Sequence, residues 1–291
     1  SDGALVEGIL TFDRDEIIPE PDKLLIAAHL PTTNLEAWQP VVDLFTPSPA
    51  NQPMDRSANR RLPIFDLHFD QLDVATFKIK DIKARVDINP EDTAIRFNSD
   101  LADGLIRLSA NKTQVPWVEL SRLSLPSAVL QQKIGLQTAD PRRFVAVDLA
   151  IESLFVGAKK WGSLGFELRP EISGAAFNKI RGNLFGLRPG MFDQEPPTEF
   201  FWSFDGTEHG SRVVGPVGVD NIGDIFTGFD TEPVADSGSG KLVFDLAWQD
   251  KPWAISRENL NGQFQIELRD GSFYKSSGGA NATLKLVSLL N

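Results

Sequence analysis

The sequence predicts a mainly β protein, built as an elongated, curled sheet of repeated antiparallel strands with a few short helices. Three observations lead to this fold class: strand-type alternation of apolar residues, an internal repeat, and a composition that favours turns. The 291 residues include 20 Phe, 23 Gly and 19 Pro but a single Tyr and two Met. This balance is typical of sheet and turns rather than of a helical bundle.

The clearest strand pattern lies near the C-terminal end. In residues 242–248, Leu, Phe, Leu and Trp occupy every second position. The same alternation returns at 264–268, just before the turn Arg269-Asp270-Gly271. A period of two predicts strands that bury one face and leave the other in water.

One stretch of the chain is repeated. Residues 66–74 (DLHFDQLDV) align with residues 148–156 (DLAIESLFV) at an offset of 148 − 66 = 82. In both copies the apolar residues change from odd to even positions, which a regular strand could do only by switching faces. We therefore expect a β-bulge or bend at Gln71 and Ser153. Two such units predict a sheet that grows by repetition.

Segments rich in Pro, Gly, Ser or charge predict linkers at 47–60, 131–142, 188–197 and 231–240. They divide the chain into N-terminal strands with a short helix (1–60), a first β repeat unit (61–138), a second one (139–197), and C-terminal strands with short helices (198–291). We expect a helix over 222–229 capped at Asp220-Asn221, and further helices at 35–45 and 282–290.

Composition and spacing argue against several kinds of chemistry. The net charge of −11 disfavours binding to nucleic acid or to an anionic membrane surface. The absence of Cys removes disulfides, thiol nucleophiles and thiolate metal sites. His29, His68 and His209 share no metal-ligand spacing, and the FDGTEHG segment around Asp205 is interpreted as a turn. With no phosphate loop and no nucleophile elbow, we predict no enzyme activity, cofactor or metal site.

A set of residues follows in a fixed order near the C-terminal end. Its members are Leu246, Trp248, Pro252, Ser256, Leu260-Asn261-Gly262, Leu268, Asp270-Gly271, Phe273 and the stretch 284–290. In this order they resemble the C-terminal part of the AsmA-like superfamily, and its YhdP-type branch most closely. Weaker matches lie in 23–45 and 139–157. The resemblance implies that the chain is the C-terminal part, truncated at its end, of a periplasmic protein anchored in the inner membrane by a segment outside this chain.

The same resemblance implies a fold and a function. Proteins of this superfamily are thought to form a taco-like groove with an apolar lining, which carries phospholipids between the inner and outer membranes without catalysis. Envelope proteins would be their other partners. The lining residues expected here, taken from the alternating strands, are Phe65, Leu67, Phe69, Val147, Leu149, Ile151, Leu242, Phe244, Leu246, Phe264, Ile266 and Leu268.

Two other classes of function remain open at this point. From the residues alone, a closed sandwich whose apolar faces fill a core is the simpler interpretation, and it would suit a structural or assembly protein of the bacterial envelope. A carbohydrate-active module would instead need an exposed aromatic platform or a pair of positioned carboxylates. Whether the apolar lining is open distinguishes these classes.

Overall fold

Strands dominate the structure, which is a computed structural model. It describes residues 8–13, 24–34, 63–74, 77–111, 113–127, 139–192, 194–229, 232, 235–236, 238–256, 258–269 and 272–273. The predicted mainly β class is confirmed. The helices predicted at 35–45 and 282–290 lie outside the described residues.

The chain divides into two compact units, Ser1–Ser124 (unit 1) and Leu125–Asn291 (unit 2). The strands of unit 1 are β1 (Gly8–Phe12), β2 (Leu24–Asn34), β3 (Ile64–Val74), β4 (Phe77–Ile88), β5 (Asp92–Asn98), β6 (Ala102–Ser109) and β7 (Trp117–Leu125). Each pairs with the next along the chain. The pairs β1–β2 and β2–β3 are parallel, so the sheet is mixed rather than purely antiparallel. The segment between β2 and β3 spans residues 35–63, which is long enough for the crossover that a parallel pair requires.

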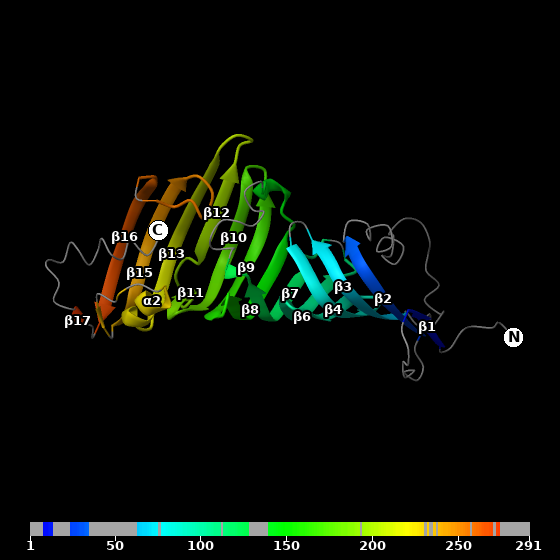
Figure 1. The fold of residues 1–291 in the computed structure, drawn as a ribbon. Coiled ribbons are helices and arrows are strands. Elements are labelled where there is room, and N and C mark those ends of the chain that lie inside the picture. Colours follow the sequence, from blue (N-terminus) through cyan, green and yellow to red (C-terminus); the bar gives the residue numbers. More distant parts are fainter. Residues whose placement is uncertain are drawn as a thin grey trace. The chain divides into compact units, whose positions relative to one another are not determined.

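Unit 2 contains the longer strands. They are β8 (Val147–Val156), β9 (Lys159–Glu171), β10 (Gly174–Leu184), β11 (Leu187–Pro189), β12 (Thr198–Phe204), β13 (His209–Val219), β14 (Ala235–Asp236), β15 (Ser239–Gln249), β16 (Leu260–Arg269) and β17 (Ser272–Phe273). Figure 1 shows most of them side by side, with β12 between β10 and β13. The short β11 also joins β10 to β13, so the linker predicted at 188–197 begins inside a strand.

The predicted helix over 222–229 is confirmed as α2 (Ile222–Gly228). Its cap is Asn221, whose side-chain oxygen accepts a hydrogen bond of 2.8 Å from the backbone N–H of Gly223. Ile222, Ile225 and Phe226 of α2 form a buried cluster with Val219 of β13. This cluster lies at the lower ends of β13 and β15 (Figure 1).

The internal repeat is visible in the strand register. Leu67 lies opposite Ala84 in the β3–β4 pair, and Leu149 lies opposite Phe166 in the β8–β9 pair, 149 − 67 = 82 residues later. The bulge predicted at Ser153 is confirmed, because the β8–β9 register shifts between Ile151 and Leu154. No such shift occurs at Gln71.

In the first copy the backbone irregularity lies on β4 and not on β3. The β3–β4 register is the same before and after Gln71, so the prediction of a bulge at Gln71 is wrong. Asp81 of β4 has φ 47° instead, a left-handed conformation that a carboxylate residue tolerates better than most. Its carboxylate also lies 2.9 Å from Nε2 of His68. A single distorted residue therefore accommodates the change of phase in unit 1.

Candidate functional site

One face of the unit 2 sheet is apolar from strand to strand. Residues that lie opposite each other in paired strands share a face, so the registers give its members directly. One line of opposite residues consists of Val147, Leu168, Phe177, Phe200, Val213 and Leu246. We call this line the cross-strand row. It crosses six neighbouring strands, and at about 4.8 Å per step it extends roughly 24 Å.

Aromatic rings make much of this face continuous. The ring centroids of Phe166 and Phe177 are 5.3 Å apart, and those of Phe177 and Phe200 are 5.5 Å apart. The ring centroids of Phe200 and Trp248 are 6.1 Å apart. These spacings are in the range of favourable ring–ring contacts. The rings thus form an apolar surface that runs across the strands rather than along one of them.

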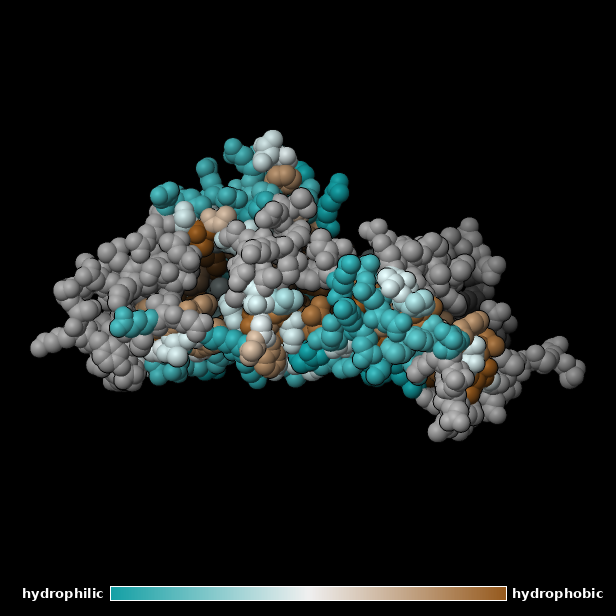
Figure 2. Space-filling model, in the orientation of Figure 1, coloured by the Kyte–Doolittle hydropathy of each residue, from teal (hydrophilic) through white to brown (hydrophobic). Residues whose placement is uncertain are grey.

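The cross-strand row is half-buried throughout. The buried cluster of unit 2 is instead found around α2, where Phe226 is 0% exposed. In a closed sandwich, residues at the centre of a sheet face would be buried like Phe226. In Figure 2, hydrophobic atoms of unit 2 lie in a hollow below the hydrophilic residues at the upper strand ends. These observations support an open apolar lining.

The opposite face of the same strands is polar. Arg212 of β13 makes two hydrogen bonds to Asp245 of β15, at 2.8 and 2.7 Å. Lys179 donates a hydrogen bond of 2.7 Å to Glu167, and this bond lowers the pKa of the Glu167 carboxyl. The sheet therefore has one face suited to water and one suited to hydrocarbon.

Aromatic clusters bound the apolar face at both ends of the strands. At the lower end, Trp161, Phe185 and Phe229 pack with centroids 5.3 to 5.7 Å apart, beside α2. At the upper end, Trp202 contacts Phe144 at 5.6 Å and Trp253 at 5.4 Å. The half-buried cross-strand row lies between these two clusters.

The structure brings most of the predicted lining residues together. On the apolar face of unit 2 lie Val147, Leu149, Ile151, Leu242, Phe244, Leu246, Phe264 and Ile266. Leu268 follows in β16, where its backbone lies opposite Gly240. Phe65, Leu67 and Phe69 share one face of unit 1, opposite Val86, Ala84 and Ile82 respectively.

Four aromatic residues on this apolar face were not among the predicted set. They are Phe166, Phe177, Phe200 and Trp248. A signal for some of them was present, because Phe200, Trp202 and Phe204 alternate as strictly as the residues of β15. The register that aligns these strands with β8 is what places them on the same face.

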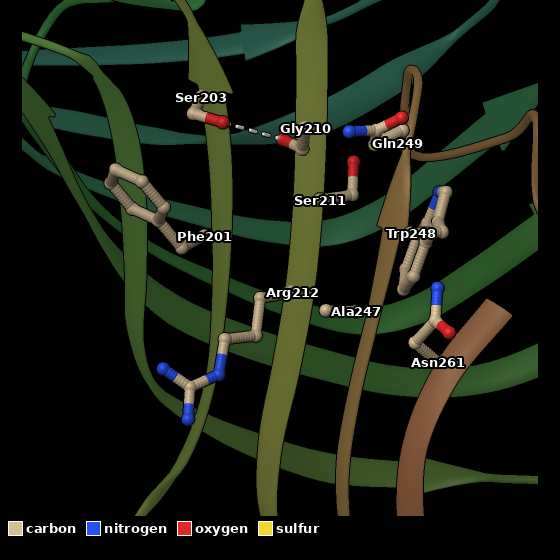
Figure 3. A pocket seen from close by; sticks show the side chains of 9 residues that line it. All are labelled: Phe201, Ser203, Gly210, Ser211, Arg212, Ala247, Trp248, Gln249 and Asn261. Atoms are coloured by element: carbon tan, nitrogen blue, oxygen red, sulfur yellow. Dashed lines mark hydrogen bonds between the residues drawn. The ribbon is translucent and has the colours of Figure 1, made fainter. Parts of the chain in front are cut away.

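A small pocket of about 250 Å³ lies on the same strands, mainly on the polar face (Figure 3). It is lined by Phe201, Ser203, Gly210, Ser211, Arg212, Ala247, Trp248, Gln249 and Asn261. The hollow exists because Gly210 and Ala247 have little or no side chain between larger neighbours. Arg212, its charged group, is already paired with Asp245.

The acidic and imidazole side chains near residue 205 form the predicted turn. The Asp205 carboxylate accepts hydrogen bonds of 2.8 Å from the backbone N–H groups of Thr207 and Glu208. These bonds lower the pKa of Asp205 to about 2. Within the described part of the chain, no group of three or more His, Asp or Glu side chains has an arrangement that could hold a metal ion.

Comparison with models of protein families matches residues 1–291 to the YhdP protein family. The chain belongs to the YhdP family. This membership confirms the resemblance found near the C-terminal end, and it is that of an AsmA-like envelope protein. No curated protein and no solved structure matches the YhdP-family chain. Within the ranges that the structure describes, it has no helix of the length and hydrophobicity needed to cross a bilayer.

Proposed function

We propose that this YhdP-family chain carries phospholipids by holding their acyl chains on the apolar face of its sheet. The observation that supports this most directly is the cross-strand row, which is apolar across six strands and half-buried at every position. A surface of this kind is too large and too continuous to be explained by scattered exposed hydrophobic residues.

The energy of transfer explains why such a face is sufficient. Each methylene removed from water contributes about 0.8 kcal/mol, so the two chains of a phospholipid gain on the order of 20 kcal/mol on leaving water. One leaflet of a bilayer is about 15 Å of hydrocarbon, half of the roughly 30 Å core. The row, at roughly 24 Å by strand spacing, is longer than this. An acyl chain therefore remains in apolar contact while it moves along the row.

The proposed activity needs no catalytic group. Dispersion and hydrophobic contacts are non-directional, so a lipid that shifts by one methylene exchanges one set of contacts for an equivalent set. The charged groups of the opposite face keep that face in water. The protein would lower the barrier to lipid movement without making or breaking a bond.

The full-length protein would act in the periplasm, between the inner and outer membranes, with an anchor in the inner membrane outside this chain. Phospholipid would be its cargo, and other envelope proteins its partners. These assignments rest on membership of the YhdP family together with the half-buried cross-strand row.

The decisive experiment is to purify the chain from bacteria and identify co-purifying lipids by mass spectrometry. Stoichiometric phospholipid is expected, and Phe244→Asp should remove most of it. Val243→Asp is the matched control. Val243 directly precedes Phe244 in β15, lies on the opposite face and is 37% exposed. Leu149→Asp applies the same test to β8, which lies several strands away from β15 on the same apolar face.

The folded state of each variant is checked by circular dichroism and urea unfolding. A folded protein without lipid would reject the transport function and favour a structural role in the envelope. Global unfolding of Phe244→Asp and Leu149→Asp alike would show that these residues belong to a filled core. Equal lipid loss in Val243→Asp would also contradict the proposal.

A further inference from the structure

Two chain segments cover the upper end of the apolar face of unit 2, and both contact the same side chain. The first contains the 3-10 helix η3 (Pro141–Arg143), followed by Phe144. The second is the stretch 251–256 after β15, which contains Trp253. Phe144 and Trp253 each pack edge-on against Trp202 of β12, with interplanar angles of 70° and 79°. Both segments therefore rest on the Trp202 ring.

The Trp202 side chain is also hydrogen-bonded to the neighbouring strand. Its indole Nε1 donates to Nδ1 of His209 on β13 over 3.1 Å. His209 is itself stacked on Phe204, with centroids 4.3 Å apart. An indole N–H is only a donor, so Nδ1 of His209 must be an acceptor. The imidazole is then neutral, with its proton on Nε2, because both nitrogens of an imidazolium are donors.

We propose that neutral His209 is a positioning residue that holds Trp202 and, through it, both covering segments, and that protonation of His209 releases them. On protonation the N–H of Trp202 faces a second N–H and loses its acceptor. A buried donor without a partner is unfavourable, so the ring turns and the contacts with Phe144 and Trp253 loosen. The upper end of the apolar face then opens to lipid.

The charges around His209 act in both directions. Burial is the largest effect and lowers the pKa of His209, and Lys251 lowers it further. Asp250, Asp140 and Asp205 raise it. The other charged groups of the 3-10 helix, Arg142 and Arg143, both pair with Asp140, and the Arg142 guanidinium lies 4.8 Å from the Phe204 ring centroid. The net shift is downward from 6.5. His209 is therefore neutral at pH 7.5, and release is expected only in acidic solution.

Hydrogen–deuterium exchange of the purified chain tests this directly. His209→Asn places an amide oxygen near the position of Nδ1, so it can accept from Trp202 at any pH. At pH 5.5, segments 139–146 and 251–256 should exchange several-fold faster in the wild type than in His209→Asn. At pH 7.5 the two proteins should agree. Comparison at equal pH removes the intrinsic pH dependence of exchange.

Two further variants complete the test. His209→Phe, which offers no acceptor, should exchange fast in both segments at both pH values, whereas His68→Asn in unit 1 should behave as the wild type. If His209→Phe does not fold, the comparison of wild type with His209→Asn decides alone. Equal exchange in these two proteins at pH 5.5 would overturn the proposal.

The consequence for lipid rests on the proposed function and is measured separately. Release of a pyrene-labelled phosphatidylethanolamine from the loaded chain should be several-fold faster at pH 5.5 than at 7.5, in the wild type but not in His209→Asn. A chain that takes up no lipid at pH 7.5 would reject the proposed function. The exchange experiment would still decide the role of His209.

Discussion

Leu149 of β8 lies directly opposite Phe166 of β9 on the apolar face of unit 2. In unit 1 the corresponding positions, 82 residues earlier, are Leu67 and Ala84. The register is conserved between the two copies while the partner changes from a methyl group to a ring. In unit 2 that ring belongs to the aromatic surface that crosses the strands.

The first prediction concerns Phe177, at the centre of the cross-strand row. Phe177→Ala should lower the amount of bound phospholipid several-fold, because two ring–ring contacts are lost at once. Since Phe177 is only half-buried, the free energy of unfolding should fall by about 1–2 kcal/mol, below the roughly 3–5 kcal/mol of a fully buried Phe. Lipid mass spectrometry and urea unfolding measure the two effects. A large loss of stability with unchanged lipid would contradict the assignment.

The second prediction concerns Phe226 of α2, which is 0% exposed. Phe226→Ala should lower the free energy of unfolding by about 3–5 kcal/mol, because it leaves a cavity in a closely packed cluster. Urea unfolding followed by circular dichroism gives this value. A change below about 1 kcal/mol would mean that α2 is not held by this side chain.

The third prediction concerns Gly262 in β16, whose φ is 136° and where an added Cβ would lie 2.0 Å from the carbonyl oxygen of Asp245. Gly262→Ala should destabilise the β15–β16 pair by about 2–4 kcal/mol, because backbone strain and a clash with backbone act together. Gly206→Ala is the control, since its φ is 111° but no atom lies within 4 Å. This variant should lose only about 1 kcal/mol. Equal melting temperatures for the two variants would show that the clash is relieved without cost.

The fourth prediction concerns acid stability. Asp205 has its pKa lowered from 3.8 to about 2 by hydrogen bonds from Glu208 and Thr207. A carboxyl whose pKa is lower in the folded state stabilises the protein fully above the unfolded value, and this contribution is lost as pH falls through the folded value. In Asp205→Asn the melting temperature should therefore fall less steeply than in the wild type between pH 4 and pH 2. Parallel curves in this window would exclude the effect.

Much of the fold could be predicted because its signals are local. The period-two alternation in β8 and β15 depends only on neighbouring residues, as does the cap and spacing of α2. The bulge at Ser153 followed from the change of phase within one strand. The parallel pairing of β1, β2 and β3 could not be predicted in this way, since it depends on where a long connection returns. At Gln71 the phase change was visible, but which of the paired strands would distort was not.

In the candidate site, too, local patterns could be predicted and relationships between distant strands could not. Strand alternation identified Leu149, Phe244 and other residues that the registers place on the apolar face of unit 2. The aromatic surface through Phe166, Phe177 and Phe200 depends on the order in which strands pair, with β12 between β10 and β13. The hydrogen bond between Trp202 and His209 depends on the register of β12 with β13, where Trp202 lies opposite Ser211 and Phe204 lies opposite His209. Neither relationship is contained in the sequence of a single strand.

The shared register of the two repeat copies has a consequence for how such a chain can change length in evolution. The hairpin β8–β9 presents its apolar residues in the order already present in β3–β4, so a duplicated hairpin brings a matching face with it. Each added hairpin would widen a sheet by about 9.6 Å, two strand spacings. The width of the apolar face can thus be set by the number of hairpin copies, without new kinds of residue at the facing positions.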